Sequence, residues 1–405
     1  MNPLRVLHLM DGLGLGGAER QLLLLLQHTP RERFTHLVCH VSSHAELAPY
    51  FQEQGISVRS LAIGGRRSLV GAVAGVIRSM AVFRPNLIHA DGIYSRILAA
   101  ATGRLTLTPV LTTVGSPVRW PREVRELRRA VLHSRSKHRS LLRFVHQRVW
   151  RQPNVQIMAV SEAVRQNLLD AHRVPAFRIS VVLRGVDLQV MTPDASPAIG
   201  RLRRDLIPGG AWPVLLNVGR LTPEKGQEYA IRALPSVRRR FPDAVLLLAG
   251  DGVLRKHLAE VAHECGVAES VRLLGSRDDV PALLQCADIF VLPSLIEGAA
   301  GALLEAMAMR LPVVATSIPA VVEAAGDVVQ LVPPADPQGL AEGIVTVAEA
   351  SDETRAAMGQ RERIIVESRY DIRAHAAAFA TLCERVAGRI DLEFDSPALA
   401  ASKKA

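Results

Sequence analysis

Short apolar runs alternate with amphipathic stretches along almost the whole chain. Runs of this length are typical of strands buried on both faces of a sheet, and the stretches between them have helical spacing. Strands that alternate with helices predict parallel sheets covered by helices, so we expect two doubly wound α/β units. The first group of runs is at residues 4–10, 35–41, 58–63, 87–90, 110–114, 156–160 and 179–183, and the second is at 214–218, 244–249, 271–274, 288–292, 313–315 and 328–332.

Proline and glycine concentrate between the two groups, at residues 187–213. This composition predicts a connection between two domains. We therefore expect an N-terminal domain at residues 1–187 and a C-terminal domain at residues 188–369. A helical segment is predicted at 370–390, and residues 391–405 are expected to form a disordered tail.

The strongest chemical signal follows the apolar run at residues 288–292. Glu297 and Glu305 are separated by a turn of small residues, after which a helix is predicted to begin. A helix N-terminus offers N–H groups and partial positive charge to a phosphate, and carboxylates accept hydrogen bonds from hydroxyl groups. The segment therefore predicts a ligand that has both a phosphate and hydroxyl groups. Its candidate binding residues are Glu297, Gly298, Ala299, Ala300, Gly301 and Glu305.

Two basic residues follow the first apolar run of the second group. Ligands of open α/β sheets lie beyond the carboxyl ends of the strands, so Arg220 and Lys225 are predicted to face a cleft. There they can stabilise an anionic leaving group. The alternative is a pair of ordinary surface bases in a chain with 49 Lys and Arg.

A glycine loop follows the first apolar run. Gly12, Gly14 and Gly17 match the G-x-G-x-x-G fingerprint of dinucleotide-binding proteins. An oxidoreductase of that kind needs an acidic residue after the second strand to bind the ribose, and residues 38–43 contain none. We rank this alternative low.

In their order along the chain, these motifs resemble the retaining glycosyltransferases of family 4. The resemblance rests on Gly16 to Arg20, on Gly219 to Gly226, on the turn from Gly275 to Pro281, and on Pro293 to Ala308. It implies the GT-B fold, in which two Rossmann-like domains face each other across a cleft. It also implies a nucleotide diphosphate sugar of UDP or GDP type as the co-substrate, with no metal or other cofactor.

The resemblance assigns a role to each candidate residue. Arg220 and Lys225 stabilise the departing diphosphate, while Glu297 binds sugar hydroxyls. Glu305 binds the nucleotide ribose. The other positions that the resemblance carries over are Gly16 and Gly17, beside donor phosphate and acceptor, and Arg277, where the family holds the base. The implied reaction transfers a sugar, with retention, to a hydroxyl of a glycan or lipid-linked acceptor in surface polysaccharide or lipopolysaccharide synthesis.

The chain departs from the family at several positions. Arg184 replaces the usual asparagine, and Val114 stands where many members carry a histidine near the transferred sugar. His89 and Asp91, at the end of the preceding run, are the candidates for that polar role on the acceptor side. The missing histidine leaves open a catalytically silent GT-B scaffold in a polysaccharide assembly. The charged residues of the other motifs are intact, which favours an active enzyme over a silent scaffold.

Charge adds a candidate partner. The formal net charge is +10, and residues 119–151 hold eleven Lys or Arg against two Glu, with apolar residues at helical spacing. We expect basic amphipathic helices that contact an anionic membrane surface; aromatic residues are too few to favour nucleic acid. No apolar run approaches the ~20 residues of a membrane span. We therefore expect a cytoplasmic protein, peripheral on the inner face of the membrane.

Overall fold

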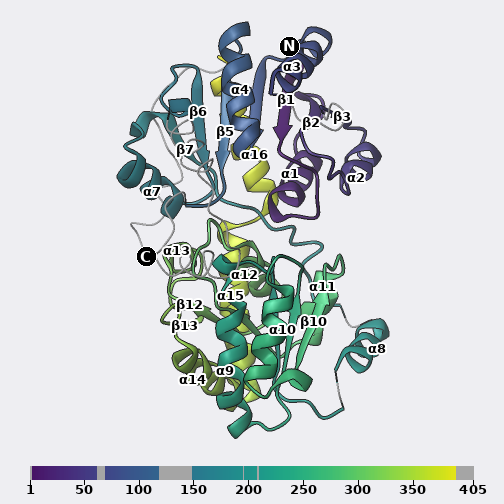
Figure 1. Cartoon of the computed structure of the whole chain (residues 1–405), viewed down its shortest axis with the longest axis vertical. Helices are drawn as coiled ribbons and strands as arrows, with labels where there is room; N and C mark the ends of the chain where they lie inside the picture. Colours follow the sequence, from purple (N-terminus) through teal and green to yellow (C-terminus); the bar gives the residue numbers. More distant parts are fainter. Residues whose placement is uncertain (1, 62–68, 118–147, 195, 208, 389–405) are drawn as a thin grey trace.

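The computed structural model describes residues 2–61, 69–117, 148–194, 196–207 and 209–388. In this part of the chain, the strands form two separate sheets, which occupy the upper and lower halves of Figure 1. We call these the N-terminal half and the C-terminal half of the molecule. The predicted fold class, two doubly wound α/β units, is confirmed.

The sheet of the N-terminal half has the strand order β3-β2-β1-β4-β5-β6-β7, and neighbouring strands are parallel. The strands are Leu4–Met10 (β1), Phe34–His40 (β2), Ser57–Ser60 (β3), Leu87–Asp91 (β4), Val110–Val114 (β5), Val155–Ala159 (β6) and Ile179–Val181 (β7). Its helices are Gly17–Gln27 (α1), Ala48–Glu53 (α2), Leu69–Phe83 (α3), Ile93–Thr106 (α4) and Glu162–His172 (α7).

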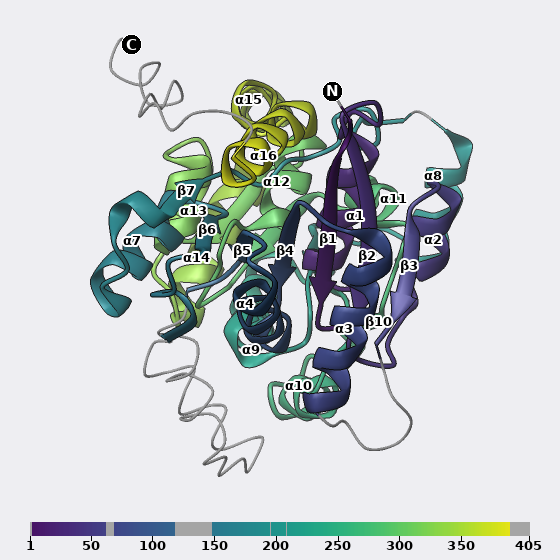
Figure 2. The same ribbon diagram turned by 90° about the horizontal axis from the view of Figure 1, so that it is seen from above.

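Helices cover both faces of this sheet, because successive residues of a strand point to opposite sides. Leu7 and Leu9 of β1 pack in one core with α3 and α4. Val6 packs on the other side with α1 and with α16 (Ile372–Val386), the last helix of the described chain. Figure 2, which looks onto this half, shows α4 and α16 on opposite faces of the sheet.

The sheet of the C-terminal half has the order β10-β9-β8-β11-β12-β13, again parallel. The strands are Val214–Val218 (β8), Val245–Ala249 (β9), Val271–Gly275 (β10), Ile289–Leu292 (β11), Val313–Thr316 (β12) and Gln330–Val332 (β13). One face carries Gln227–Arg240 (α9), Arg255–Glu264 (α10) and Pro337–Glu349 (α14); the other carries Val280–Cys286 (α11), Gly301–Ala308 (α12), Pro319–Ala325 (α13) and Asp352–Arg369 (α15). Each strand of both sheets overlaps a run predicted from the sequence.

The connection between the halves contains a helix that the sequence analysis did not predict. Residues Pro197–Leu206 form α8, which begins where the Ser196 side chain accepts a hydrogen bond from the N–H of Ala198. Proline favours the first turn of a helix, because its missing N–H has no partner there in any case. Arg203 ties α8 to the C-terminal half through its ion pair with Asp288 at 3.2 Å. One of the prolines that suggested a plain connection, Pro197, therefore starts a helix.

The chain crosses between the halves twice, and the two crossings lie side by side. The N–H of Val186 donates to the carbonyl of Tyr370 at 2.7 Å, and the N–H of Ile372 donates back to Val186 at 3.0 Å. Beyond this pair, α16 packs Phe379 and Cys383 into the core of the N-terminal half. The predicted tail, residues 391–405, lies outside the described residues.

In each sheet the strand order reverses between two central strands, β1 and β4 in one and β8 and β11 in the other. Ligands of doubly wound sheets bind beyond the carboxyl ends of strands at such a reversal. The glycine loop follows β1, Arg220 follows β8, and Glu297 follows β11. The topology thus brings the sequence motifs of both halves to facing edges.

Candidate active site

Glu297 and Lys225 form an ion pair at the centre of the facing edges. Lys225 Nζ donates to Glu297 Oε1 at 2.6 Å, and Ser294 Oγ donates to the same oxygen at 2.8 Å. Glu297 is 9% exposed, so its carboxylate is well shielded from water. Among the described residues both bonds end on Oε1, which leaves Oε2 of Glu297 to accept from a ligand hydroxyl. Two residues chosen from separate motifs are therefore in direct contact.

The turn before α12 is shaped by close contact with the N-terminal half. A Cβ atom on Gly298 would lie 1.9 Å from the carbonyl oxygen of Gly115, so only glycine fits there. Ala300, the residue before the helix, adopts a left-handed conformation with φ 45°, and no side chain of the described residues caps α12. The first N–H groups of α12 therefore remain for a ligand, at the positive end of the helix.

Glu305 lies in α12, near two arginines from the N-terminal half. Burial raises the pKa of its carboxyl, and the charges of Arg184 and Arg20 oppose that rise. From the sequence, Arg184 is notable only as a departure from the family pattern, and Arg20 is not among the candidate residues. Nothing local in the sequence shows that either residue reaches the C-terminal half.

Arg220 is the most exposed of the charged candidates, with 67% of its side chain accessible. It pairs with Glu224 at 3.4 Å, and its carbonyl accepts from Gln227. In the N-terminal half, burial raises the pKa of Glu19, and the charge of Arg220 acts against this rise. Arg220 therefore faces the N-terminal half without being fixed by a close partner there.

Gly16 and Gly17 form the start of α1. A Cβ on Gly16 would lie 2.3 Å from Glu19 Oε2, and one on Gly17 would lie 3.3 Å from Arg184 Nη2. In the part of the chain that the structure describes, no side chain caps α1. Both glycines are thus at the facing edge, in contact with charged side chains.

His89 lies inside the sheet rather than at its edge. It is 2% exposed, its Nδ1 lies 2.9 Å from Nδ1 of His8, and its Nε2 lies 2.7 Å from Thr113 Oγ1. Both ring nitrogens therefore have partners within the core, and the structure does not bring His89 to the other candidates. Asp91 ends the same strand and pairs with Arg96 at 3.6 Å, and burial raises its pKa.

Arg277 follows β10 and forms two hydrogen bonds with Asp279, at 2.8 and 2.5 Å. Its carbonyl accepts from Arg20 Nη2 at 3.3 Å, a contact between the two halves. Arg277 is separate from the Lys225–Glu297 pair but belongs to the same pair of facing edges.

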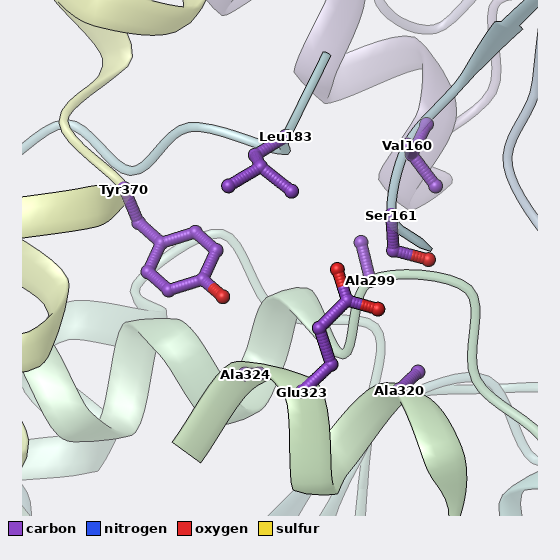
Figure 3. A pocket seen from close by; sticks show the side chains of 8 residues that line it. All are labelled: Val160, Ser161, Leu183, Ala299, Ala320, Glu323, Ala324 and Tyr370. Carbon is purple, nitrogen blue, oxygen red and sulfur yellow. The ribbon is translucent and has the colours of Figure 1, made fainter. Parts of the chain in front are cut away.

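A second contact between the halves lies under the turn at Gly298. Glu323 of α13 accepts hydrogen bonds from the N–H groups of Glu162 and Ala163, both at 2.7 Å, and so caps α7 of the other half. Ser161 Oγ donates to the carbonyl of Gly298 at 2.5 Å. Figure 3 shows Glu323 and Ser161 around a pocket of ≈ 10 Å³, room for about one water molecule. The turn at Gly298 is thereby bonded to the N-terminal half.

Most of the basic stretch at residues 119–151 lies outside the described residues, so its predicted helices are untested. In the part of the chain that the structure describes, no helix is long and apolar enough to cross a membrane. The same residues contain no cluster of three or more His, Cys, Asp or Glu that could hold a metal ion.

Two family models match the chain. The model described as "Glycosyltransferase Family 4" matches residues 15–190, and "Glycosyl transferases group 1" matches residues 212–350. The chain belongs to family 4 of the glycosyltransferases. The first match contains Gly16, Gly17 and Arg184, and the second contains Lys225 and both glutamates, so the family covers both facing edges.

Curated relatives match part of the chain. The chain is 36% identical over 150 residues to a "GDP-mannose-dependent alpha-(1-6)-phosphatidylinositol monomannoside mannosyltransferase" of Mycobacterium tuberculosis, a match of 35% of this chain. It is 35% identical over 153 residues to a "UDP-Gal:alpha-D-GlcNAc-diphosphoundecaprenol alpha-1,3-galactosyltransferase" of Escherichia coli, a match of 36% of this chain. In both cases the match spans 38% of the relative's length.

Solved structures show the same fold over nearly the whole chain. Anabaena Alr3699/HepE in complex with UDP-glucose superposes with a TM-score of 0.79 at 22% identity, covering 94% of this chain and 99% of that one. WaaG, a glycosyltransferase involved in lipopolysaccharide biosynthesis, gives a TM-score of 0.72 at 16% identity, with 94% and 99% covered. The GT-B fold implied by the resemblance to family 4 is confirmed.

Proposed function

We propose that this protein is a retaining glycosyltransferase that moves a sugar from a UDP or GDP sugar to a hydroxyl of a glycan or lipid-linked acceptor. The observation that carries the proposal is the Lys225–Glu297 pair beside the uncapped start of α12. It combines an ammonium, helix N–H groups and a shielded carboxylate, which suit a ligand with both phosphates and hydroxyls.

The donor binds mainly to the C-terminal half. Glu305 accepts hydrogen bonds from the ribose, and Glu297 accepts them from the sugar. The diphosphate lies against the start of α12, at Gly298 to Gly301, within reach of Arg220 and Lys225. Arg277 lies near the base. The base stays open between uracil and guanine, since the relatives and solved neighbours include both a GDP-mannose-dependent enzyme and a UDP-glucose complex.

In the reaction, the acceptor hydroxyl oxygen forms a bond to the anomeric carbon as the bond from that carbon to the diphosphate oxygen breaks. The hydroxyl proton passes to the departing diphosphate oxygen on the same face of the sugar, so configuration is retained. Negative charge grows on the diphosphate during this step. Arg220 and Lys225 stabilise it more in the transition state than in the ground state.

The acceptor binds to the N-terminal half, beside Gly16 and Gly17. Asp91 provides a partly exposed carboxylate at that edge, and the relatives named for phosphatidylinositol and diphosphoundecaprenol substrates support a lipid-linked acceptor.

We place the protein on the cytoplasmic face of the membrane, held through residues 119–151. Co-sedimentation with anionic liposomes, weakening as salt rises, is the expected result. Equal binding to neutral and anionic liposomes, or none to either, contradicts this location.

A donor screen tests the function. In a thermal-shift assay, either the uridine compounds (UDP and UDP sugars) or the guanosine compounds (GDP and GDP sugars) should raise the melting temperature. Binding to the native state adds RT ln(1 + [L]/Kd) to the free energy of unfolding. Release of the matching nucleoside diphosphate on addition of a lipid-linked acceptor then measures transfer. If no nucleotide or nucleotide sugar shifts the melting temperature, the silent scaffold becomes the better account.

A further inference from the structure

Arg184 lies between the two helix starts that form the candidate site. Its Nη2 donates to the carbonyl oxygen of Gly17 at 2.7 Å, at the beginning of α1. A Cβ on Gly301 would lie 2.9 Å from both Cζ and Nε of Arg184, at the beginning of α12. The guanidinium thus fills the space between the N-terminal half that supplies it and the helix that faces the donor.

This placement concentrates positive charge. The start of α12 carries partial positive charge, no side chain caps it, and a guanidinium beside it adds a full charge of the same sign. The hydrogen bond of the Arg184 guanidinium ends on a carbonyl rather than on a carboxylate, although its charge acts on Glu305 and on Asp91. An anion bound between Arg184 and α12 would relieve this repulsion.

We propose that Arg184 binds a phosphate oxygen of the donor diphosphate, as a third cation beside Arg220 and Lys225. This inference rests on the proposed function. Arginine presents several N–H donors in a plane, so the guanidinium can keep its bond to Gly17 and still donate to a phosphate. The diphosphate is then held by both halves of the molecule, and the full set of cations is complete only when the halves face each other as they do here.

The small residues around Arg184 fit this role. Gly17 and Gly301 leave room for the guanidinium on both sides, and larger side chains at either position would displace it. The asparagine that family 4 usually has here is shorter and uncharged. The additional charge is therefore a property of this chain rather than of the family pattern.

The test is calorimetric titration of the purified full-length protein with UDP and GDP, and with uridine and guanosine. Arg184→Gln keeps a donor for the Gly17 carbonyl and removes the charge; Arg184→Lys keeps the charge. Arg361→Ala, on the exposed surface of α15, is the matched control. Melting temperatures verify that each variant is folded.

We expect Arg184→Gln to weaken binding of the diphosphate that wild type recognises by about 10- to 100-fold and to leave nucleoside binding unchanged. Arg184→Lys should recover part of the loss, and Arg361→Ala should match wild type. Equal losses for nucleoside and diphosphate would show that Arg184 only supports the fold of the site. Unchanged diphosphate binding with a raised KM for a phosphorylated acceptor would place the phosphate on the acceptor and overturn the proposal. If wild type binds no nucleotide, both this inference and the proposed function fail.

Discussion

The central strands of the two sheets occupy the same topological place but carry different residues. In the N-terminal half, His8 of β1 is in register with His89 of β4. In the C-terminal half, the corresponding strands pair Leu216 of β8 with Phe290 of β11. At this position one half therefore has a hydrogen-bonded pair of histidines, and the other has two apolar side chains below a charged edge. The fold tolerates both, since His8 and His89 form hydrogen bonds with each other and with His36 and Thr113.

The comparison predicts that catalysis fails most when the charged edge of the C-terminal half is changed. Arg220→Ala and Lys225→Ala should each lower kcat by about two to three orders of magnitude, because the departing diphosphate loses a stabilising cation. Steady-state kinetics measures this, with circular dichroism to verify the fold. A variant at either position that turns over like wild type would contradict the assigned role.

The second prediction concerns the histidines of the N-terminal half. His36, His8, His89 and Thr113 form one hydrogen-bonded chain. Burial lowers the pKa of His36 to about 4 and of His89 to about 3. The unfolded chain binds protons below about pH 6.5, whereas these folded-state rings stay neutral. Their contribution to stability is therefore complete above pH 6.5 and is lost as the pH falls towards 4.

Urea unfolding at pH 7, 6 and 5 measures this loss, expected at roughly 1.4 kcal/mol per pH unit for each histidine that resists protonation. His36→Gln should flatten the dependence. His263→Gln, on the exposed surface of α10 in the C-terminal half, should leave it unchanged. Equal slopes for wild type and His36→Gln would rule out the histidine chain as the cause.

The third prediction separates the two glutamates of the donor side. Glu305→Gln should weaken binding of the nucleoside diphosphate by about tenfold or more, because a charged acceptor for ribose hydroxyls is lost. Glu297→Gln should affect the nucleotide sugar more than the free nucleoside diphosphate. Titration of each variant with both ligands measures the difference. If both variants bind both ligands like wild type, the motif serves only the fold.

The smallest expected effect is at the contact between the halves. Glu323→Gln should lower stability by about 1 kcal/mol, since a charged cap of α7 is replaced by a neutral one. Differential scanning calorimetry should show a melting temperature about 2–4 °C lower. Glu264→Gln, at the exposed end of α10, is the control. A Glu323→Gln variant as stable as that control would show that the interdomain cap contributes little.

The sequence could predict the features that depend on local patterns, but not the contacts between distant residues. Parallel strands buried on both faces appear as continuous apolar runs, so every strand was predicted. Lys225 and Glu297 belong to local motifs at strand ends. Arg184, in contrast, meets Gly17 across 167 residues, and Arg20 meets Arg277 across 257. No local pattern encodes such contacts. For the same reason the sequence could not predict that His89 bonds to His8 and Thr113.

The contact of Gly298 with Gly115 has a consequence for the exchange of halves between related enzymes. A chimera that takes its C-terminal half from another member of the family brings a new turn against the Gly115 carbonyl and the Ser161 hydroxyl of this chain. A Cβ at position 298 has no room there, and a shifted backbone loses the bond to Ser161. A chimera with a new C-terminal half therefore requires that residues 115 and 161 be exchanged together with the turn at residue 298, although they lie on the other side of the boundary between the halves.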